Sequence, residues 1–90
     1  DSFSVDGYNN QYFNLNIDEI SISNIPAFIG KSIAETKIKT KYHIVVVCII
    51  NPSKNSIINP NSDYVFSEFD RIMLIGDKDN LDDFASNETS

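Results

Sequence analysis

The chain has 90 residues and a mass of 10.1 kDa, the size of one small domain, which buries only about 60% of its unfolded surface and is expected to rely on a partner or a dimer. The 13 acidic and seven basic side chains give a net charge of −6, which argues against nucleic acid as a partner because phosphate contacts require Lys and Arg. The longest apolar run, residues 44–50, is shorter than the roughly 20 residues that cross a bilayer, so no direct membrane insertion is expected.

The N-terminal part of the chain predicts a weakly structured lead-in followed by a strand. Residues 1–13 carry Asn, Ser and aromatic side chains without a period, which predicts a linker or a loose edge strand. Alternating apolar residues from Leu15 predict a strand over 14–23. The apolar positions change phase around residues 18 and 19, which indicates a β-bulge there.

A short helix and a lysine-rich stretch follow. Pro26 ends the strand, and Ser32 with Glu35 three residues later forms a capping-box pattern. This pattern predicts a helix of about two turns with Ile29 and Ile33 toward the core. Beyond it, lysines at alternate positions favour an extended stretch: Lys37, Lys39 and Lys41.

The middle of the chain predicts a buried hairpin. Residues 43–50 are almost all β-branched and lack alternation, which predicts a strand covered on both faces at the centre of the sheet. Residues 51–55 have the composition of a turn, and residues 56–58 return as the partner strand.

The C-terminal third predicts one more strand and a helix. A second turn covers 59–63, a short apolar stretch 64–66, and the last strand 71–75. Leu81, Phe84 and Ala85 have helical spacing, which predicts a helix over 77–85, with 86–90 frayed and 87–90 a disordered tail. The fold class is therefore α+β. We expect a small βαβββα domain over 14–86 with one mainly antiparallel sheet, forming a dimer.

The residue types argue against an enzyme and against a metal site. His43 is the only histidine and is predicted to lie at the surface, while Cys48 is predicted to be a core residue of its strand. One His and one Cys cannot form a zinc site or an internal disulfide, so a reducing compartment is favoured. Residues 77–82 begin like a calcium loop but lack its glycine, and the preferred interpretation is a solvated helix start. The glycosylation pattern at 87–89 matters only in a secreted protein.

Lysines between residues 31 and 41 are the one place where this acidic chain could hold an anion, because several ammonium groups together would offset phosphate charge. A solvated strand edge is the other interpretation of the same residues. The residues alone leave both interpretations open.

Three stretches between Phe28 and Phe84 together resemble the TrkA-C domain, the C-terminal lobe of regulators of potassium conductance. The first resembles the family's aliphatic-Gly-x-Ser opening, the second its hydrophobic strand, and the third its proline followed by an Asp-x-Leu strand that ends in Gly. In this sequence they are residues 29–39, residues 42–50, and residues 58–60 with 70–76. The sequence differs at His43 and at Phe69, where the family often has Gly.

The resemblance implies a cytoplasmic, non-enzymatic sensing domain. It implies a homodimer formed through the sheet and helices, associated with a membrane-embedded cation channel or transporter at the inner membrane. The resemblance implies no cofactor, but in some family members cyclic di-AMP binds between two lobes as a regulatory ligand. The matching positions here are Ile33, Lys39 and Val45, where Lys39 replaces an arginine and Val45 an asparagine.

The predicted ligand-binding residues combine the lysine cluster with the family positions. They are Ile33, Lys39, Lys41, His43, Val45 and Pro60. No catalytic residue and no metal ligand is predicted. Two alternatives remain: an extracellular or periplasmic β-rich adhesion module, suggested by the Asn- and Ser-rich turns, and a dimerisation scaffold that binds no ligand.

Overall fold

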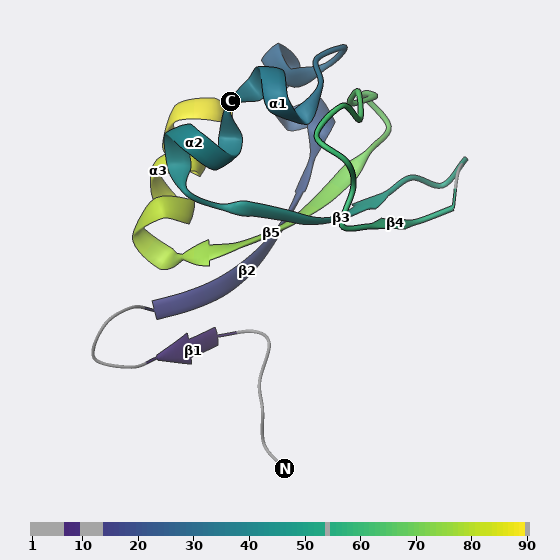
Figure 1. The fold of residues 1–90 in the computed structure, drawn as a ribbon. Helices are drawn as coiled ribbons and strands as arrows, with labels where there is room; N and C mark the ends of the chain where they lie inside the picture. The colour runs from purple at the N-terminus through teal and green to yellow at the C-terminus, as the bar shows by residue number, and fades with distance from the viewer. Residues whose placement is uncertain (1–6, 10–13, 54, 90) are drawn as a thin grey trace.

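The structure is a computed structural model that describes residues 7–9, 14–53 and 55–89. Within them the chain forms five strands, three α-helices and two 3-10 turns (Figure 1). In chain order these are β1 Gly7–Asn9, β2 Asn14–Ser21, η1 Ile22–Asn24, η2 Pro26–Phe28, α1 Ile33–Thr36, α2 Ile38–Tyr42, β3 Val45–Ile50, β4 Ile57–Ile58, β5 Arg71–Asp77 and α3 Lys78–Glu88. The predicted lead-in contributes β1 as an edge strand, while residues 1–6 and 10–13 lie outside the described residues.

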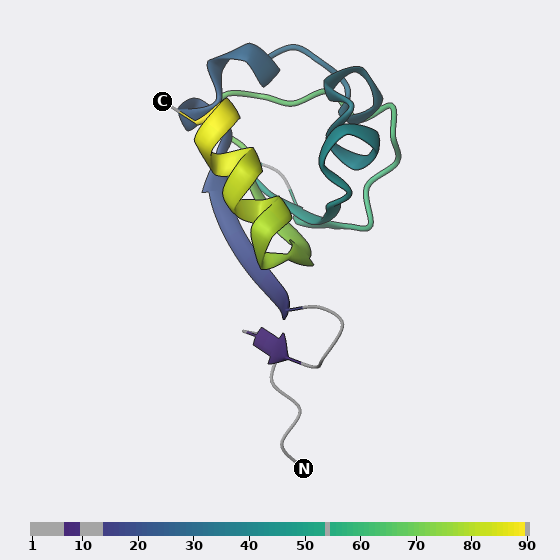
Figure 2. The ribbon, with the colours of Figure 1, turned by 90° about the vertical axis from the view of Figure 1, so that its left-hand side faces the viewer.

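All strands belong to one antiparallel sheet with the order β1-β2-β5-β3-β4. This confirms the predicted α+β class, but the central strand is β5 and not the predicted strand 43–50. The helices lie on one face of the sheet. Figure 2 shows α3 in front of β2, with α1 and α2 beside it. We call the helix-covered side the inner face and the other side the outer face.

The register explains two errors in the strand predictions. β2 pairs with β5 without interruption, so the bulge expected near residues 18 and 19 is wrong, and the irregularity lies in β3 between Val46 and Cys48. β2 simply carries apolar residues on both faces. β3 is not covered on both faces either, since Val45 is 51% exposed and Val46 8%. Cys48, expected in the core, is half-buried opposite Met73 on the outer face.

The core lies between the inner face and the helices. Ile22, Ile44, Ile72, Leu74 and Phe84 are fully buried there. The ring of Phe84 meets Tyr42 of α2 edge-on at 5.2 Å and Phe28 at 5.8 Å, which packs α3 against both the α2 segment and the loop after β2. Ile29, expected in the core, is 40% exposed, because Phe28 takes the inward position.

The lysine-rich stretch is helical rather than extended. α1 begins with the predicted capping box, in which the Ser32 hydroxyl accepts from Glu35 N–H and the Glu35 carboxylate accepts from Ser32 N–H. Lys37 adopts a left-handed φ of 57° and separates α1 from α2. The prediction failed because burial of Ile38 and Tyr42, four residues apart, outweighs the alternating lysine pattern.

The C-terminal helix is longer than predicted. α3 continues through Glu88, so the expected fraying of residues 86–88 is wrong. The Tyr42 hydroxyl donates to Glu88 over 2.5 Å, and the Thr89 hydroxyl donates to the carbonyl of Ala85. These tertiary and capping bonds hold the last turn, where the sequence alone offers few apolar residues. Ser90 lies outside the described residues.

Candidate functional site

A cleft of about 210 Å³ opens between α1, α2, the start of β3 and the turn after β4. We call it the α1–β3 cleft. Its lining residues come from four separate segments of the chain: Ile33, Ile38, Lys39, Ile44, Val45, Val46, Asn59, Pro60 and Ser62.

Backbone hydrogen bonds hold the walls of this cleft together. Ile33 N–H donates to the carbonyl of Tyr64 over 3.0 Å, and Ala34 N–H donates to that of Ser62 over 2.9 Å. A bridge between Ser32 and Val65 extends the same pairing. The segment 62–65 is therefore fastened to the start of α1, which places Ser62 beside Ile33 in the cleft.

The opposite wall of the cleft depends on a residue whose backbone is in the left-handed conformation. Asn59 has a φ of 55°, a conformation that Asn tolerates better than most residues, and its N–H donates to the carbonyl of Val47 over 2.7 Å. This bond returns the chain toward the first half of β3 after the short strand β4. Pro60 consequently lines the cleft close to Val45 and Val46.

The chemistry of the cleft is apolar with a cationic edge. Six lining residues are aliphatic or proline, Asn59 and Ser62 are polar and uncharged, and Lys39 is the charged member of the lining set. No Asp or Glu is among these residues. Such a lining can hold an apolar or planar part of a ligand. The Lys39 ammonium group can pair with a carboxylate or a phosphate of the same ligand.

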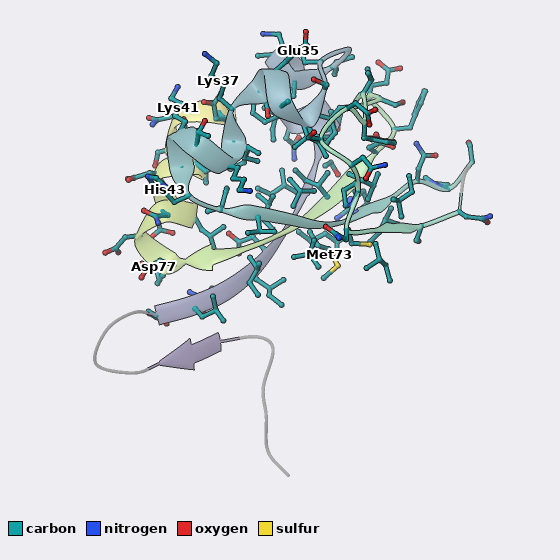
Figure 3. All side chains as sticks on the ribbon, in the orientation of Figure 1. Glu35, Lys37, Lys41, His43, Met73 and Asp77 are labelled. Atoms are coloured by element: carbon teal, nitrogen blue, oxygen red, sulfur yellow. The ribbon has the colours of Figure 1, made fainter. Side chains whose placement is uncertain are left out.

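A second hollow of about 230 Å³ adjoins the first. It shares Ile33, Lys39 and Ser62 with the α1–β3 cleft and adds Ala34, Lys37 and Thr40. Lys39 of α2 therefore lines both hollows, whereas Lys37 lines the second hollow alone. Figure 3 labels Lys37 and Lys41 on the helical side of the sheet.

The cleft brings together four of the six predicted ligand-binding residues, namely Ile33, Lys39, Val45 and Pro60. Lys41 lies outside it: its ammonium group is 3.7 Å from the Glu88 carboxylate and 5.3 Å above the Tyr42 ring. His43 is exposed with a φ of 58° and does not line the cleft, and the predicted surface position of its imidazole is confirmed.

Sequence reasoning missed five lining residues, Ile38, Ile44, Val46, Asn59 and Ser62. The Asn-Pro-Asn-Ser turn carried a signal, because a turn directly after a buried hairpin tends to bring its polar residues back to the strand. Nothing in the sequence indicated that 62–65 pairs with the start of α1.

The described residues provide no other evident chemistry. Within them no group of His, Cys, Asp and Glu side chains could hold a metal ion. Asp77 accepts from Asp79 N–H as the N-cap of α3, and Lys78 pairs with Asp82, as expected for a solvated helix start rather than a calcium loop. In the part of the chain that the structure covers, no helix has both the length and the apolar character to cross a bilayer.

Comparison with known proteins identifies this arrangement. The family model of the TrkA-C domain matches residues 19–88. The chain belongs to the TrkA-C domain family. This confirms the resemblance of the three motifs and extends it to residues 19–27, which include only the end of β2. The three helices over one face of the sheet also argue against the β-rich adhesion module.

Two of the similar proteins belong to K⁺ transport systems. The chain is 30% identical over 64 residues to the K⁺/H⁺ antiporter subunit KhtT of Bacillus subtilis, a match that covers 67% of this chain and 39% of KhtT. The C domain of the potassium transport protein KtrA, solved with cyclic di-AMP, superposes with a TM-score of 0.72 at 27% identity and covers 81% of this chain and 82% of that one.

A third similar protein is BusR of S. agalactiae. Its RCK_C domain dimer in complex with cyclic di-AMP has a TM-score of 0.67 at 27% identity, covering 78% of this chain and 85% of that one. BusR has also been solved with its promoter DNA, and there the match covers 88% of this chain but only 38% of BusR. This TrkA-C chain thus corresponds to one part of such longer proteins.

Proposed function

We propose that this chain is the regulatory domain of a potassium or other cation transport protein, acting on the cytoplasmic side of the inner membrane. As a homodimer, it would couple the occupancy of the α1–β3 cleft to a membrane-embedded channel or transporter. The domain performs no chemistry itself. A ligand would act by its different affinity for two arrangements of the dimer, a coupling of about 1–3 kcal/mol in typical cases.

The observation that carries this proposal is that the three positions that the family resemblance assigns to a ligand, Ile33, Lys39 and Val45, come from three separate segments and line one cleft. Family membership and the similarity to KhtT and KtrA support the transport context. The acidic net charge suits a domain that must not adhere to an anionic membrane surface. It also opposes direct contact with DNA, although BusR, a longer protein, binds its promoter.

A cyclic dinucleotide is the first ligand class to test, because KtrA and BusR domains were solved with cyclic di-AMP. The cleft supports such a ligand through its apolar lining and Lys39. Two differences weaken recognition of the phosphate and the base. Lys39 lacks the two-pronged guanidinium of arginine, and Val45 offers no hydrogen bond from its side chain.

Thermal melting with and without cyclic di-AMP tests this function. At a free ligand concentration of 100 Kd, a bound ligand raises the free energy of unfolding by about 2.7 kcal/mol. Lys39→Ala should abolish the increase in melting temperature, whereas Lys41→Ala, a lysine of the same helix outside the cleft, should retain it. Lys39→Arg and Val45→Asn should strengthen binding.

The remaining alternative is a scaffold that dimerises and binds no ligand, which the residues at positions 39 and 45 favour. Its outcome is distinct. The scaffold interpretation holds if the chain dimerises but its melting temperature does not respond to cyclic di-AMP, to other nucleotides or to divalent cations. The Lys39→Arg, Val45→Asn double variant should then also show no response.

A further inference from the structure

The α1–β3 cleft and the second hollow beside it share a border. Ile33, Lys39 and Ser62 line both of them. Their volumes are about 210 and 230 Å³. Each is smaller than the roughly 300–1,000 Å³ of a small-molecule site, whereas the two together reach that range. A ligand of ordinary size would therefore extend across the border from one hollow into the other.

The second hollow adds a second cation to the first. Lys37 and Lys39 both line it. Side chains two residues apart do not face each other on a continuous helix, but the left-handed φ of 57° at Lys37 separates α1 from α2. This break brings both lysines to one hollow. Non-glycine residues in such strained conformations are concentrated at ligand sites, so the backbone of Lys37 also points to a ligand contact.

The two lysines are not neutralised by carboxylates. Among the residues that the structure describes, neither Lys37 nor Lys39 forms an ion pair, whereas Lys41 does. No Asp or Glu is among the lining residues of either hollow. The acidic residues next to the lining residues in sequence are Glu35 and Asp63; both are exposed, and the Glu35 carboxylate already caps α1. The ammonium groups of Lys37 and Lys39 are therefore available to an anionic ligand.

Two lysines match the charge of a terminal phosphate. A phosphate monoester carries a charge of about −1.5 to −2 at pH 7 and offers three acceptor oxygens. Each phosphodiester group, as in a cyclic dinucleotide, carries one negative charge. A lysine is a compact point charge without the fork of arginine, so two lysines can approach different oxygens of one phosphate. The pair of Lys37 and Lys39 therefore favours a monoester over a diester.

The α1–β3 cleft can hold the rest of such a ligand. Its aliphatic lining can pack against a planar body such as a nucleobase. Within the described residues the side chains of Asn59 and Ser62 form no hydrogen bond, so their amide and hydroxyl groups are available to the polar edge of that body. Ser62 lies at the border of the two hollows, where its hydroxyl can also donate to a phosphate oxygen.

We propose that the α1–β3 cleft and the second hollow form one site for a nucleoside monophosphate. The base occupies the cleft, and the terminal phosphate lies in the second hollow between Lys37 and Lys39. This inference rests on the sensor role of the proposed function and narrows its ligand class to phosphate monoesters. Lys37, which the family resemblance does not assign to a ligand, becomes the residue that selects the monoester.

Isothermal titration calorimetry of the full chain tests the ligand class. The probes are adenosine, adenosine monophosphate, cyclic AMP and cyclic di-AMP, which share one base and differ in their phosphate groups. Adenosine monophosphate should bind about tenfold or more tightly than cyclic AMP, the effect of one additional hydrogen bond between charged groups. Adenosine, which has no phosphate, should bind most weakly.

Variants of two lysines test the role of Lys37. Lys37→Asn removes the charge while keeping a residue that tolerates the left-handed backbone, and the melting temperature of the free variant shows that it stays folded. It should weaken binding of adenosine monophosphate several-fold and leave binding of cyclic AMP nearly unchanged. Lys31→Asn is the matched control, because it changes the net charge equally at an exposed lysine that lines neither hollow. Lys31→Asn and Lys37→Arg should both bind adenosine monophosphate like the unmodified chain.

The outcomes separate this inference from the proposed function. If cyclic di-AMP binds but adenosine monophosphate binds no more tightly than cyclic AMP, the inference is wrong while the proposed function stands. The inference is also wrong if Lys37→Asn leaves binding of the monophosphate unchanged, or if Lys31→Asn weakens it equally, since net charge alone would then explain the effect. If none of these probes binds to the unmodified chain, the inference fails together with the nucleotide-sensing role of the cleft.

Discussion

At the scale of single residues, the backbone conformation at position 43 favours glycine. His43 ends α2 with φ 58° and ψ 38°, the left-handed region in which a side chain is disfavoured by about 1–2 kcal/mol. His43→Gly should therefore raise the free energy of unfolding by about 1 kcal/mol, measured by urea denaturation. Thr40→Gly, in the interior of the same helix, should lower it. A destabilised His43→Gly would mean that the imidazole makes a contact that outweighs the backbone strain.

A second residue-scale feature is the close approach between Gly76 of β5 and Ile44, which lies one residue before β3. A Cβ atom at this position would lie 2.6 Å from Cγ2 of Ile44, a buried β-branched side chain with little freedom to move. Gly76→Ala should therefore cost about 1–3 kcal/mol of unfolding free energy. The double variant with Ile44→Ala should be less destabilised than the sum of the two single variants; strict additivity would contradict the predicted clash.

At the scale of elements, α1 has only four residues and depends on its capping box. Ser32→Ala removes the acceptor for Glu35 N–H and should cost about 1 kcal/mol, measured by thermal or urea denaturation. Because Ser32 also positions the wall of the cleft, ligand binding should weaken in the same variant. Ser32→Asp, which preserves the capping acceptor, should retain both stability and binding.

The capping box also has a pH signature. Hydrogen bonds from Ser32 hold the pKa of the Glu35 carboxyl below its usual value of 4.5. A group with a lowered folded-state pKa contributes stability above its unfolded pKa and loses it as the pH falls through the folded-state value. Glu35→Gln should therefore flatten the acid limb of the stability curve below about pH 4.5, whereas an unchanged limb would mean that the box is not formed in solution.

At the scale of the whole molecule, the carboxylate and the carbonyl of the buried Asp70 together join the segments that follow β2, β3 and β4. It accepts from Asn51 Nδ2 over 2.6 Å, from the Tyr64 hydroxyl over 2.7 Å and from Ser67 N–H over 2.8 Å. The carbonyl of Asp70 also accepts from Ile22 N–H over 2.9 Å. Asp70→Ala would remove the carboxylate that accepts these three hydrogen bonds but keep the carbonyl that accepts from Ile22 N–H, and we expect a loss of roughly 3 kcal/mol or more in urea denaturation.

This network makes the fold sensitive to alkaline pH. Burial, followed by the hydrogen bond to Asp70 and its charge, raises the pKa of Tyr64 from 10 to about 12. The stability that depends on neutral Tyr64 is fully present below pH 10 and is lost as the pH rises from about 10 to 12. Tyr64→Phe should remove this loss, and a Tyr64→Phe variant with the same alkaline transition would show that another group is responsible.

The local chemistry of the chain determined much of this molecule. The strands 14–21, 45–50 and 71–77, the capping box at Ser32 and the helix after Asp77 follow from apolar periodicity and hydrogen-bonding side chains a few residues apart. These signals act within one element. For the same reason the order of the elements predicted the α+β class, and the motifs predicted the TrkA-C family.

Tertiary contacts decided what lies beyond one element. The lysine stretch became helical because Ile38 and Tyr42 bury against α3, and α3 itself extends to Glu88 because the Tyr42 hydroxyl donates to it. The central place of β5 and the one-sided cover of β3 depend on which strands pair, which periodicity does not encode. The α1–β3 cleft arises from the pairing of residues 62–65 with the start of α1, and the free energy of such long-range contacts appears only when the chain has folded.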